Sequence, residues 1–193
     1  MLVKIVDVNK ERIGLLQPSL IPEIQCKVGN ILNEINIATA GNSFGFMDGG
    51  VDLAISNRYS GVESKIRDSI NNRPLKELLV GEAIHTKLEE GKIVIYAPTM
   101  RIPMILKDSV NIYLAIKAIL LKAIDLGLEE ISIPILGAGV GQLSMKIIAT
   151  QINQAYIDVF KVYKKPNSWW ESSIKHQHLY TNNIVDLQYK KLN

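Results

Sequence analysis

The sequence predicts an α/β fold, in which helices pack in layers against a sheet of parallel or mixed strands. Short apolar runs rich in β-branched residues alternate along the chain with longer segments in which apolar residues recur at helical spacing. The chain has 193 residues, of which 47% are hydrophobic and 21% charged. Those proportions suit a single globular domain over residues 1–193 and exclude a disordered protein.

Six segments have the composition of β-strands, and four have the pattern of helices. The predicted strands are residues 3–8, 24–28, 35–40, 78–84, 92–97 and 131–136. The predicted helices are residues 10–20, 51–59, 110–126 and 145–161. Gly14 and Pro18 disfavour the first of these helices, whereas Ser144 is placed to cap the N-terminus of the last one.

The character of the sequence changes after Lys161, where Lys164-Lys165-Pro166-Asn167-Ser168 is typical of a loop. The tail, residues 162–193, is too short for a separate domain, and we expect a terminal helix and a final strand packed on the domain. Trp169 and Trp170 are expected to be buried in that packing, as tryptophan generally is.

Charge and composition limit the classes of partner that we expect for this protein. The 22 basic and 19 acidic residues give a net charge of +3 with no long basic run, so nucleic-acid binding is not indicated. The single cysteine, Cys26, excludes an intrachain disulfide and argues against a zinc site, so we expect no metal. Neither a signal peptide nor a run of about 20 apolar residues is visible. We expect a cytoplasmic protein without a membrane partner; the oligomeric state is open, with a monomer favoured.

A glycine-rich loop, Gly137-Ala138-Gly139-Val140-Gly141, lies between a predicted strand and the helix capped by Ser144. Its backbone N–H groups, together with the helix N-terminus, can form a cradle for a phosphate or diphosphate. A tight turn that needs glycine only for its dihedral angles explains the same spacing equally well. The pattern is neither the dinucleotide-binding fingerprint nor a P-loop.

A second loop, after the predicted strand 35–40, contains Gly41-Asn42-Ser43-Phe44-Gly45, which matches the G-x-S-x-G elbow of serine hydrolases. Such an elbow needs a helix directly after Ser43, and Asp48-Gly49-Gly50 interrupts any helix there. A serine hydrolase that uses Ser43 is therefore the least favoured alternative.

Both loops together resemble the macro domain family. Thr39-Ala40-Gly41-Asn42-Ser43, followed by Asp48-Gly49-Gly50-Val51-Asp52-Leu53-Ala54-Ile55, is similar to that family's Asn-Ala-Ala-Asn segment and the glycines and Val-Asp-Gly-Ala-Ile after it. Val28-Gly29-Asn30-Ile31, Gly81-Glu82-Ala83 and the 137–141 loop match further landmarks in the same order. The resemblance covers about residues 24–160 and implies a three-layer α/β/α macro domain with a mixed central β-sheet flanked by helices.

Macro domains bind ADP-ribose, and many hydrolyse ADP-ribosyl esters, so the resemblance implies a similar ligand and no further cofactor. Asn42 matches the asparagine that bonds the distal ribose, and Asp52 matches the aspartate that activates water in one hydrolase subgroup; these are the expected catalytic residues. The ligand-binding residues that the resemblance implies are Asn30, Ile31, Ala40, Gly41, Asn42, Gly49, Gly50, Val51, Gly137, Ala138, Gly139, Val140 and Gly141. Removal of ADP-ribose from a modified macromolecule and deacetylation of O-acetyl-ADP-ribose are both compatible with this set.

Some positions depart from the family pattern. Ser56 stands where the hydrolase subgroup often has a histidine, and Asn30 stands where the family has an aspartate that binds the adenine. These departures affect catalysis more than binding, so a non-catalytic module that binds ADP-ribose or a nucleotide signal is the principal alternative.

Overall fold

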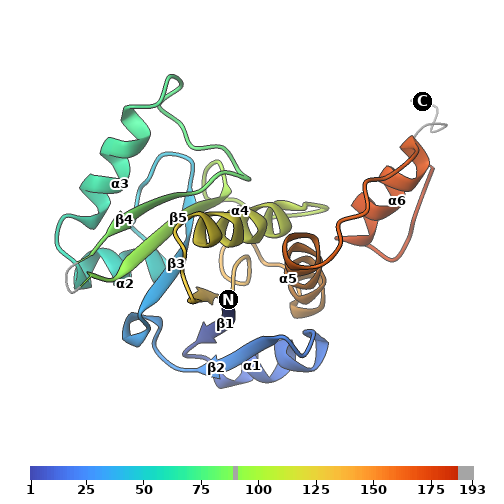
Figure 1. Cartoon of the computed structure of the whole chain (residues 1–193), viewed down its shortest axis with the longest axis horizontal. Coiled ribbons are helices and arrows are strands. Elements are labelled where there is room, and N and C mark those ends of the chain that lie inside the picture. Colours follow the sequence, from blue (N-terminus) through green and yellow to red (C-terminus); the bar gives the residue numbers. More distant parts are fainter. Residues whose placement is uncertain (89–90, 187–193) are drawn as a thin grey trace.

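A six-stranded sheet lies between two layers of helices in the computed structural model, which describes residues 1–88 and 91–186 (Figure 1). In their order across the sheet, the strands are β2 (Ile24–Val28), β1 (Leu2–Asp7), β6 (Glu130–Pro134), β3 (Asn36–Asn42), β5 (Ile93–Met100) and β4 (Ile84–Lys87). All neighbours pair in parallel except β4, which runs antiparallel to β5. The predicted three-layer α/β/α fold with a mixed sheet is confirmed.

Each face of the sheet has its own hydrophobic core, and β5 contributes to both. Ile95 and Ala97 face the core formed with α1, α4 and α5, whereas Val94 and Tyr96 face the core formed with α2 and α3. This alternation follows from the two-residue period of a strand, and a run of buried apolar residues is what a strand covered on both faces requires. The helices are α1 (Lys10–Leu16), α2 (Gly50–Arg58), α3 (Val62–Asn71), α4 (Asn111–Asp125), α5 (Met145–Phe160) and α6 (Trp169–His178).

The predicted helices at 51–59, 110–126 and 145–161 are confirmed as α2, α4 and α5, with bounds that agree to within one residue. The Ser144 hydroxyl accepts a hydrogen bond from the Ile147 N–H at 3.3 Å, as expected of a helix cap. The helix predicted at 10–20 ends at Leu16 instead, and Gln17–Ser19 forms a single 3₁₀ turn that contains Pro18. Proline lacks the N–H that a longer helix would need there.

Two elements differ from the sequence-based expectation. The strand predicted at 78–84 is misplaced: β4 begins at Ile84, and residues 78–83 form a loop, in which the Leu78 N–H donates to the Ser43 carbonyl and Gly81 has a left-handed φ of 99°. Helix α3 was not predicted, although its buried residues recur at a four-residue spacing. It begins after Gly61 without a side-chain cap, so the usual start signal is absent.

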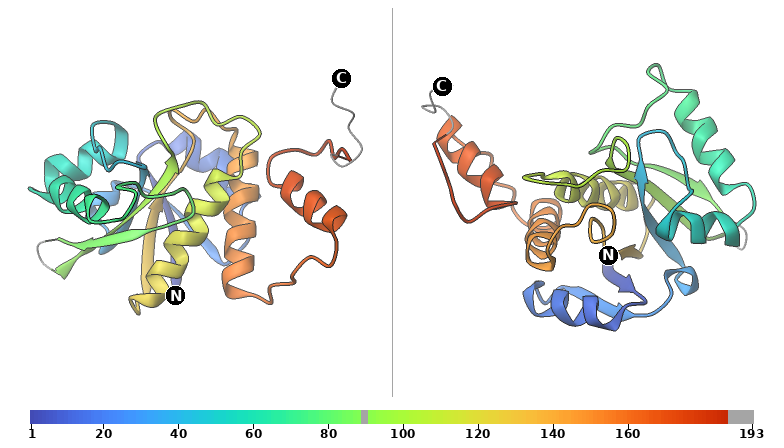
Figure 2. Two further views of the ribbon diagram at one scale, coloured as in Figure 1. Left: turned by 90° about the horizontal axis from the view of Figure 1, so that it is seen from above. Right: turned by 180° about the vertical axis from the view of Figure 1, so that it is seen from behind.

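The tail forms the terminal helix α6, which stands beside α5 and away from the sheet in two further views (Figure 2). The expectation that its two tryptophans are buried is wrong, because Trp169 is 60% exposed and Trp170 is 44% exposed. Residues 179–186 contain no strand, and the remainder of the predicted tail, residues 187–193, lies outside the described residues. In the described part of the chain, no helix is both long and apolar enough to span a membrane.

Candidate functional site

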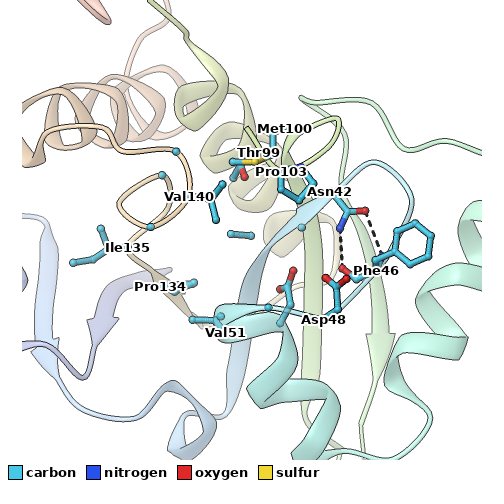
Figure 3. Close-up of a pocket in the computed structure, with 18 of the residues that line it drawn as sticks. Asn42, Phe46, Asp48, Val51, Thr99, Met100, Pro103, Pro134, Ile135 and Val140 are labelled. Atoms are coloured by element: carbon cyan, nitrogen blue, oxygen red, sulfur yellow. Dashed lines mark hydrogen bonds between the residues drawn. The ribbon is translucent and has the colours of Figure 1, made fainter. Parts of the chain in front are cut away.

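The carboxyl ends of β1, β3, β5 and β6 meet at one edge of the sheet because these strands are parallel. A cavity of about 280 Å³ opens at that edge, which is where α/β sheets generally bind ligands. Figure 3 shows its lining: Val51, Pro134 and Ile135 form an apolar side, whereas Asn42 and Asp48 lie on the opposite, polar side.

The structure brings together most of the residues singled out in the sequence. The predicted site residues that line the cavity are Ala40, Gly41, Asn42, Gly49, Gly50, Val51, Asp52, Gly137, Gly139, Val140 and Gly141. Asn30, Ile31 and Ala138 are not in the lining. Asn30 instead caps a 3₁₀ turn, Ile31–Asn33, by accepting a hydrogen bond from the Leu32 N–H at 3.0 Å.

Sequence reasoning missed several lining residues on strands β1, β5 and β6, on the segments that follow them and on the segment after β3. They are Asp7, Arg12, Phe46, Thr99, Met100, Pro103, Pro134 and Ile135. The ends of these strands were available as a signal, since every parallel strand delivers its last residues to the same edge. Only the order of the strands in the sheet shows which of those ends adjoin the two glycine-containing loops.

Free backbone donors lie on two sides of the cavity. Within the described chain, the N–H groups of residues 138–141 have no acceptor, while those of Gln142 and Leu143 close the loop onto Gly139 and Gly137. Helix α2 begins without a side-chain cap, so the N–H groups of residues 50–52 are likewise unbonded within the described chain. Both sets are the kind of donor that binds phosphate groups.

The fold requires glycine at the start of the 137–141 loop but not at its centre. Gly137 has a φ of 81°, and a β-carbon there would lie 2.8 Å from Cδ1 of Ile112. A β-carbon at Gly139 would meet nothing within 4 Å, and its φ is ordinary. The fold therefore requires glycine at 137, but it does not require glycine at 139, where the open space belongs to the cavity.

Asp52 is the buried carboxylate of the site, 7% exposed, in the first turn of α2. The Thr39 hydroxyl donates a hydrogen bond to Oδ1, Oδ2 has no hydrogen bond within the described chain, and Asp52 lines the cavity. Burial raises the pKa of Asp52 to about 7; the hydrogen bond from Thr39 opposes this, and the charges of Asp48 and Glu63 add to it. A carboxyl group with such a pKa can accept a proton near neutral pH.

Asn42 organises the loop that surrounds it. Its Oδ1 accepts hydrogen bonds from the Phe44 and Phe46 N–H groups at 3.0 and 3.3 Å, and its Nδ2 donates to the Phe46 carbonyl at 2.8 Å (Figure 3). The backbone of Asn42 is fixed by the buried Tyr96 hydroxyl, which accepts from its N–H and donates to its carbonyl. One N–H of the side-chain amide is left for a ligand.

Ser43 is placed unfavourably for a nucleophile. It is fully buried, its N–H donates to the Arg101 carbonyl at 3.1 Å, and it does not line the cavity. Helix α2 begins seven residues later, at Gly50, and no histidine is among the described residues that line the cavity. The geometry of a serine hydrolase elbow is therefore not formed around Ser43.

A family model described as Macro domain matches residues 38–152, which is more than half of the chain. An uncharacterized protein of the archaeon Aeropyrum pernix is 31% identical over 121 residues. That match covers 62% of this chain and 61% of the archaeal protein, so it spans less than two thirds of its relative.

Several solved structures are similar in fold. The macrodomain of Mycobacterium tuberculosis DarG has a TM-score of 0.59 at 19% identity, over 69% of this chain and 90% of that one. Thermosipho africanus DarTG, solved in complex with ADP-ribose, has a TM-score of 0.58 at 18% identity, over 69% and 38% of the two chains. The Oceanobacillus iheyensis macrodomain, solved with ADP, has a TM-score of 0.59 at 23% identity, over 67% and 72%.

Proposed function

The chain belongs to the macro domain family, and from that premise we propose that its cavity binds ADP-ribose or a closely related derivative. Two observations support this proposal: free N–H groups on two sides of the cavity, and an apolar side next to a polar one. Similar folds have been solved with ADP-ribose and with ADP.

The arrangement suggests how each part of the ligand would be held. The diphosphate would accept hydrogen bonds from the N–H groups of residues 138–141 and from the N-terminus of α2. The adenine ring would lie on the apolar side, where Asp7 also lines the cavity. Its Oδ1 accepts from the Asn9 N–H at 2.7 Å and its Oδ2 lies 4.0 Å from Arg12, so Oδ2 is the atom that would accept from the exocyclic amine. Asp7 takes this place in the proposal because it lines the cavity, whereas Asn30 does not.

We further propose that the protein hydrolyses an ADP-ribosyl ester, with Asp52 as the general base. The observation that carries this proposal is a buried carboxyl group with a pKa of about 7 in the lining of the cavity. Asp52 would take a proton from water as that water attacks the ester carbonyl. Asp52 would then pass this proton to the alkoxide of the leaving ribose, which yields ADP-ribose and a free acid and regenerates the carboxylate.

The test is single-turnover hydrolysis of O-acetyl-ADP-ribose at pH 7.5 by the wild-type protein and by Asp52→Asn, with ADP-ribose binding measured on both. General base catalysis contributes about 10²–10⁴-fold, so turnover should fall by at least about 100-fold in the variant while the affinity for ADP-ribose is kept. Equal turnover by both proteins would rule out Asp52 as the base.

A non-catalytic binding module is the second candidate function. It is favoured by Ser56, a half-buried residue of α2 where a related hydrolase subgroup often has histidine. Tight binding of ADP-ribose with hydrolysis at the uncatalysed rate, in wild type and variant alike, is the result that this alternative predicts.

A further inference from the structure

A second cavity lies between the tail and the helices next to it. The tail folds back beside α5 (Figure 2), and the cavity is lined by residues of α4 and α5 on one side and by residues 162–166 and α6 on the other. Its volume is about 450 Å³, which suits a small-molecule ligand. Among the described residues, none lines both this cavity and the one at the sheet edge.

Two lysines tie the walls of this second cavity together. The Lys117 ammonium of α4 lies 5.3 Å from the ring centroid of Tyr113 and 5.3 Å from that of Tyr163, so it joins α4 to the tail. Lys175 of α6 donates to the Lys164 carbonyl at 3.1 Å. The segment between α5 and α6 is thus held both to α4 and to α6, which gives the cavity a defined wall.

The α5 side of the cavity presents hydrogen-bond acceptors. Asp158 accepts from the Tyr113 hydroxyl through Oδ2 at 2.7 Å and from Nε2 of Gln154 through Oδ1 at 2.8 Å. It forms no salt bridge with any described basic residue. Because Gln154 turns its nitrogen toward the carboxylate, its carbonyl oxygen is left without a partner in the described chain. That oxygen and the second lone pairs of the carboxylate can accept from a ligand.

The two hydroxyl groups on this side already donate within the protein. Thr150 donates to the Lys146 carbonyl at 3.0 Å, and Tyr113 donates to Asp158. Burial, and then the hydrogen bond to Asp158, raise the pKa of Tyr113, so its hydroxyl keeps its proton and its role as donor. The ligand that fits this side is therefore one that itself donates hydrogen bonds.

The tail side presents groups that bind anions. Lys164, His176 and His178 line the cavity and make no salt bridge with the acidic residues that the structure describes. Lys175, which pairs with Glu171 at 3.0 Å, is three residues from His178 on α6 and shares its face. Ammonium and imidazole N–H groups are both donors to phosphate oxygens.

We propose that this second cavity binds a guanine nucleotide. The Watson–Crick edge of guanine carries two neighbouring donors, N1–H and the N2 amine, which match the acceptors of Asp158 and Gln154. Adenine carries one donor and one acceptor at that edge. The ring of Tyr163, which is 53% exposed, offers a surface on which the base can stack, and the phosphate would meet the basic groups of the tail.

A simple anion such as inorganic phosphate would use only the tail side. The Asp158 carboxylate would repel it, and the acceptors on α5 would gain no donor. An acidic side opposite a basic side favours a ligand with a donor-rich base at one end and a phosphate at the other. The proposal does not depend on which ligand occupies the cavity at the sheet edge.

The test is isothermal titration of the full chain with GMP, with AMP and inorganic phosphate as comparisons. Each titration is run without and with about 1 mM ADP-ribose, which would fill a micromolar site at the sheet edge. We expect one GMP site per chain with a Kd of about 1–100 μM, unchanged by ADP-ribose. AMP and phosphate should bind at least about tenfold more weakly, because each lacks donors that the α5 side can accept.

Asp158→Asn tests recognition of the base. The variant should bind GMP at least about tenfold more weakly, because a charged acceptor is lost. Xanthosine monophosphate has a carbonyl at C2 in place of the amine, and an asparagine N–H can donate to it. The variant should therefore bind xanthosine monophosphate better than GMP, whereas the wild type shows the reverse order. Loss of structure alone would not produce this reversal.

Lys164→Gln/His178→Gln tests recognition of the phosphate. Neither side chain bonds to the described part of the protein, so the fold should be kept while GMP binds at least about tenfold more weakly. The matched control is Lys165→Gln, which removes the exposed neighbouring lysine that does not line the cavity. Its affinity for GMP should stay within about twofold of the wild type, since a solvent-exposed charge is largely screened.

Circular dichroism and the melting temperature verify that each variant is folded. The proposal is overturned if GMP does not bind at up to about 1 mM, or if AMP or inorganic phosphate binds as tightly as GMP. Affinity for GMP that Asp158→Asn and Lys164→Gln/His178→Gln both retain would also overturn it. So would GMP binding that ADP-ribose abolishes, because the nucleotide would then occupy the cavity at the sheet edge.

Discussion

At Asp52, burial favours the neutral acid while the hydroxyl of Thr39 stabilises the carboxylate, and the balance leaves the pKa of Asp52 at about 7. The folded-state pKa is thus above the ordinary value of 3.8, so the native state binds more protons than the unfolded chain between those two pH values. This carboxyl group therefore lowers the stability of the protein progressively as the pH rises from about 4 to 7. Burial of the Asp52 carboxylate thus lowers the stability of the fold at neutral pH, and the same burial makes this group a base in the cavity.

Asp52→Asn should therefore stabilise the fold at pH 8 while it abolishes the proposed hydrolysis. Asparagine can still accept from Thr39 and has no charge to bury, so the free energy of unfolding should rise by up to about 4 kcal/mol, three pKa units at 1.36 kcal/mol each. Thermal unfolding at pH 8 and at pH 4 provides the measurement. The gain should disappear at pH 4; a loss of stability at pH 8 would contradict the role of burial.

Thr39→Val tests the opposing contribution. Valine has nearly the shape of threonine without the hydroxyl donor, so the pKa of Asp52 should rise above about 7. If Asp52 is the base, the rate of ester hydrolysis rises with pH through this pKa, and the midpoint of the pH–rate profile should move to higher pH in the variant. A profile with an unchanged midpoint would show that the titrating group lies elsewhere.

At the scale of the elements, the 137–141 loop combines a glycine that the fold requires with one that only the cavity requires. Gly137→Ala places a methyl group 2.8 Å from Ile112 at a left-handed φ, and should destabilise the protein by about 1–3 kcal/mol. The β-carbon of Gly139→Val meets nothing within 4 Å, so this variant should change stability by less than about 0.5 kcal/mol. Chemical denaturation of the two variants makes the comparison, and equal stabilities would contradict the assignment.

Strands β1, β2 and β6 are linked beside η2, the 3₁₀ turn Ile31–Asn33, by the buried carboxylate of Glu34. It accepts from Lys27 at 2.6 Å, from the Ser132 hydroxyl at 3.2 Å and from Lys4 at 3.5 Å. Burial alone would raise the pKa of Glu34, but the hydrogen bond and charge of Lys27, with Ser132 and Lys4, lower it below its usual value of 4.5. A carboxyl group with a lowered pKa stabilises the fold above about pH 4.5, and this contribution is lost as the pH falls through the folded-state pKa.

Glu34→Gln should accordingly cost about 1–3 kcal/mol at pH 7, because two lysines lose their buried partner. The difference between wild type and variant should shrink as the pH falls toward 3. Urea unfolding at pH 7, 5 and 3 measures this trend, and a difference that does not depend on pH would show that packing, and not charge, is responsible.

At the scale of the whole molecule, local patterns predicted most of the elements and both glycine-containing loops. Those predictions succeeded because strand period, helix period and capping are encoded within a few residues. The place of Asp7 and Arg12 in the cavity depends on the order of strands, which no local pattern carries. The exposure of Trp169 depends likewise on how the tail stands relative to α5, and average burial of tryptophan was a poor guide to it.

The cavity at the sheet edge is the central claim, and isothermal titration of the protein with ADP-ribose tests it most directly. We expect one site per chain with micromolar affinity, about −8 kcal/mol, and a loss of at least about tenfold in Gly139→Val, which adds a side chain to a residue of the cavity lining where a β-carbon meets no protein atom within 4 Å. Absence of binding by the wild type, or equal binding by the variant, would contradict the proposed site.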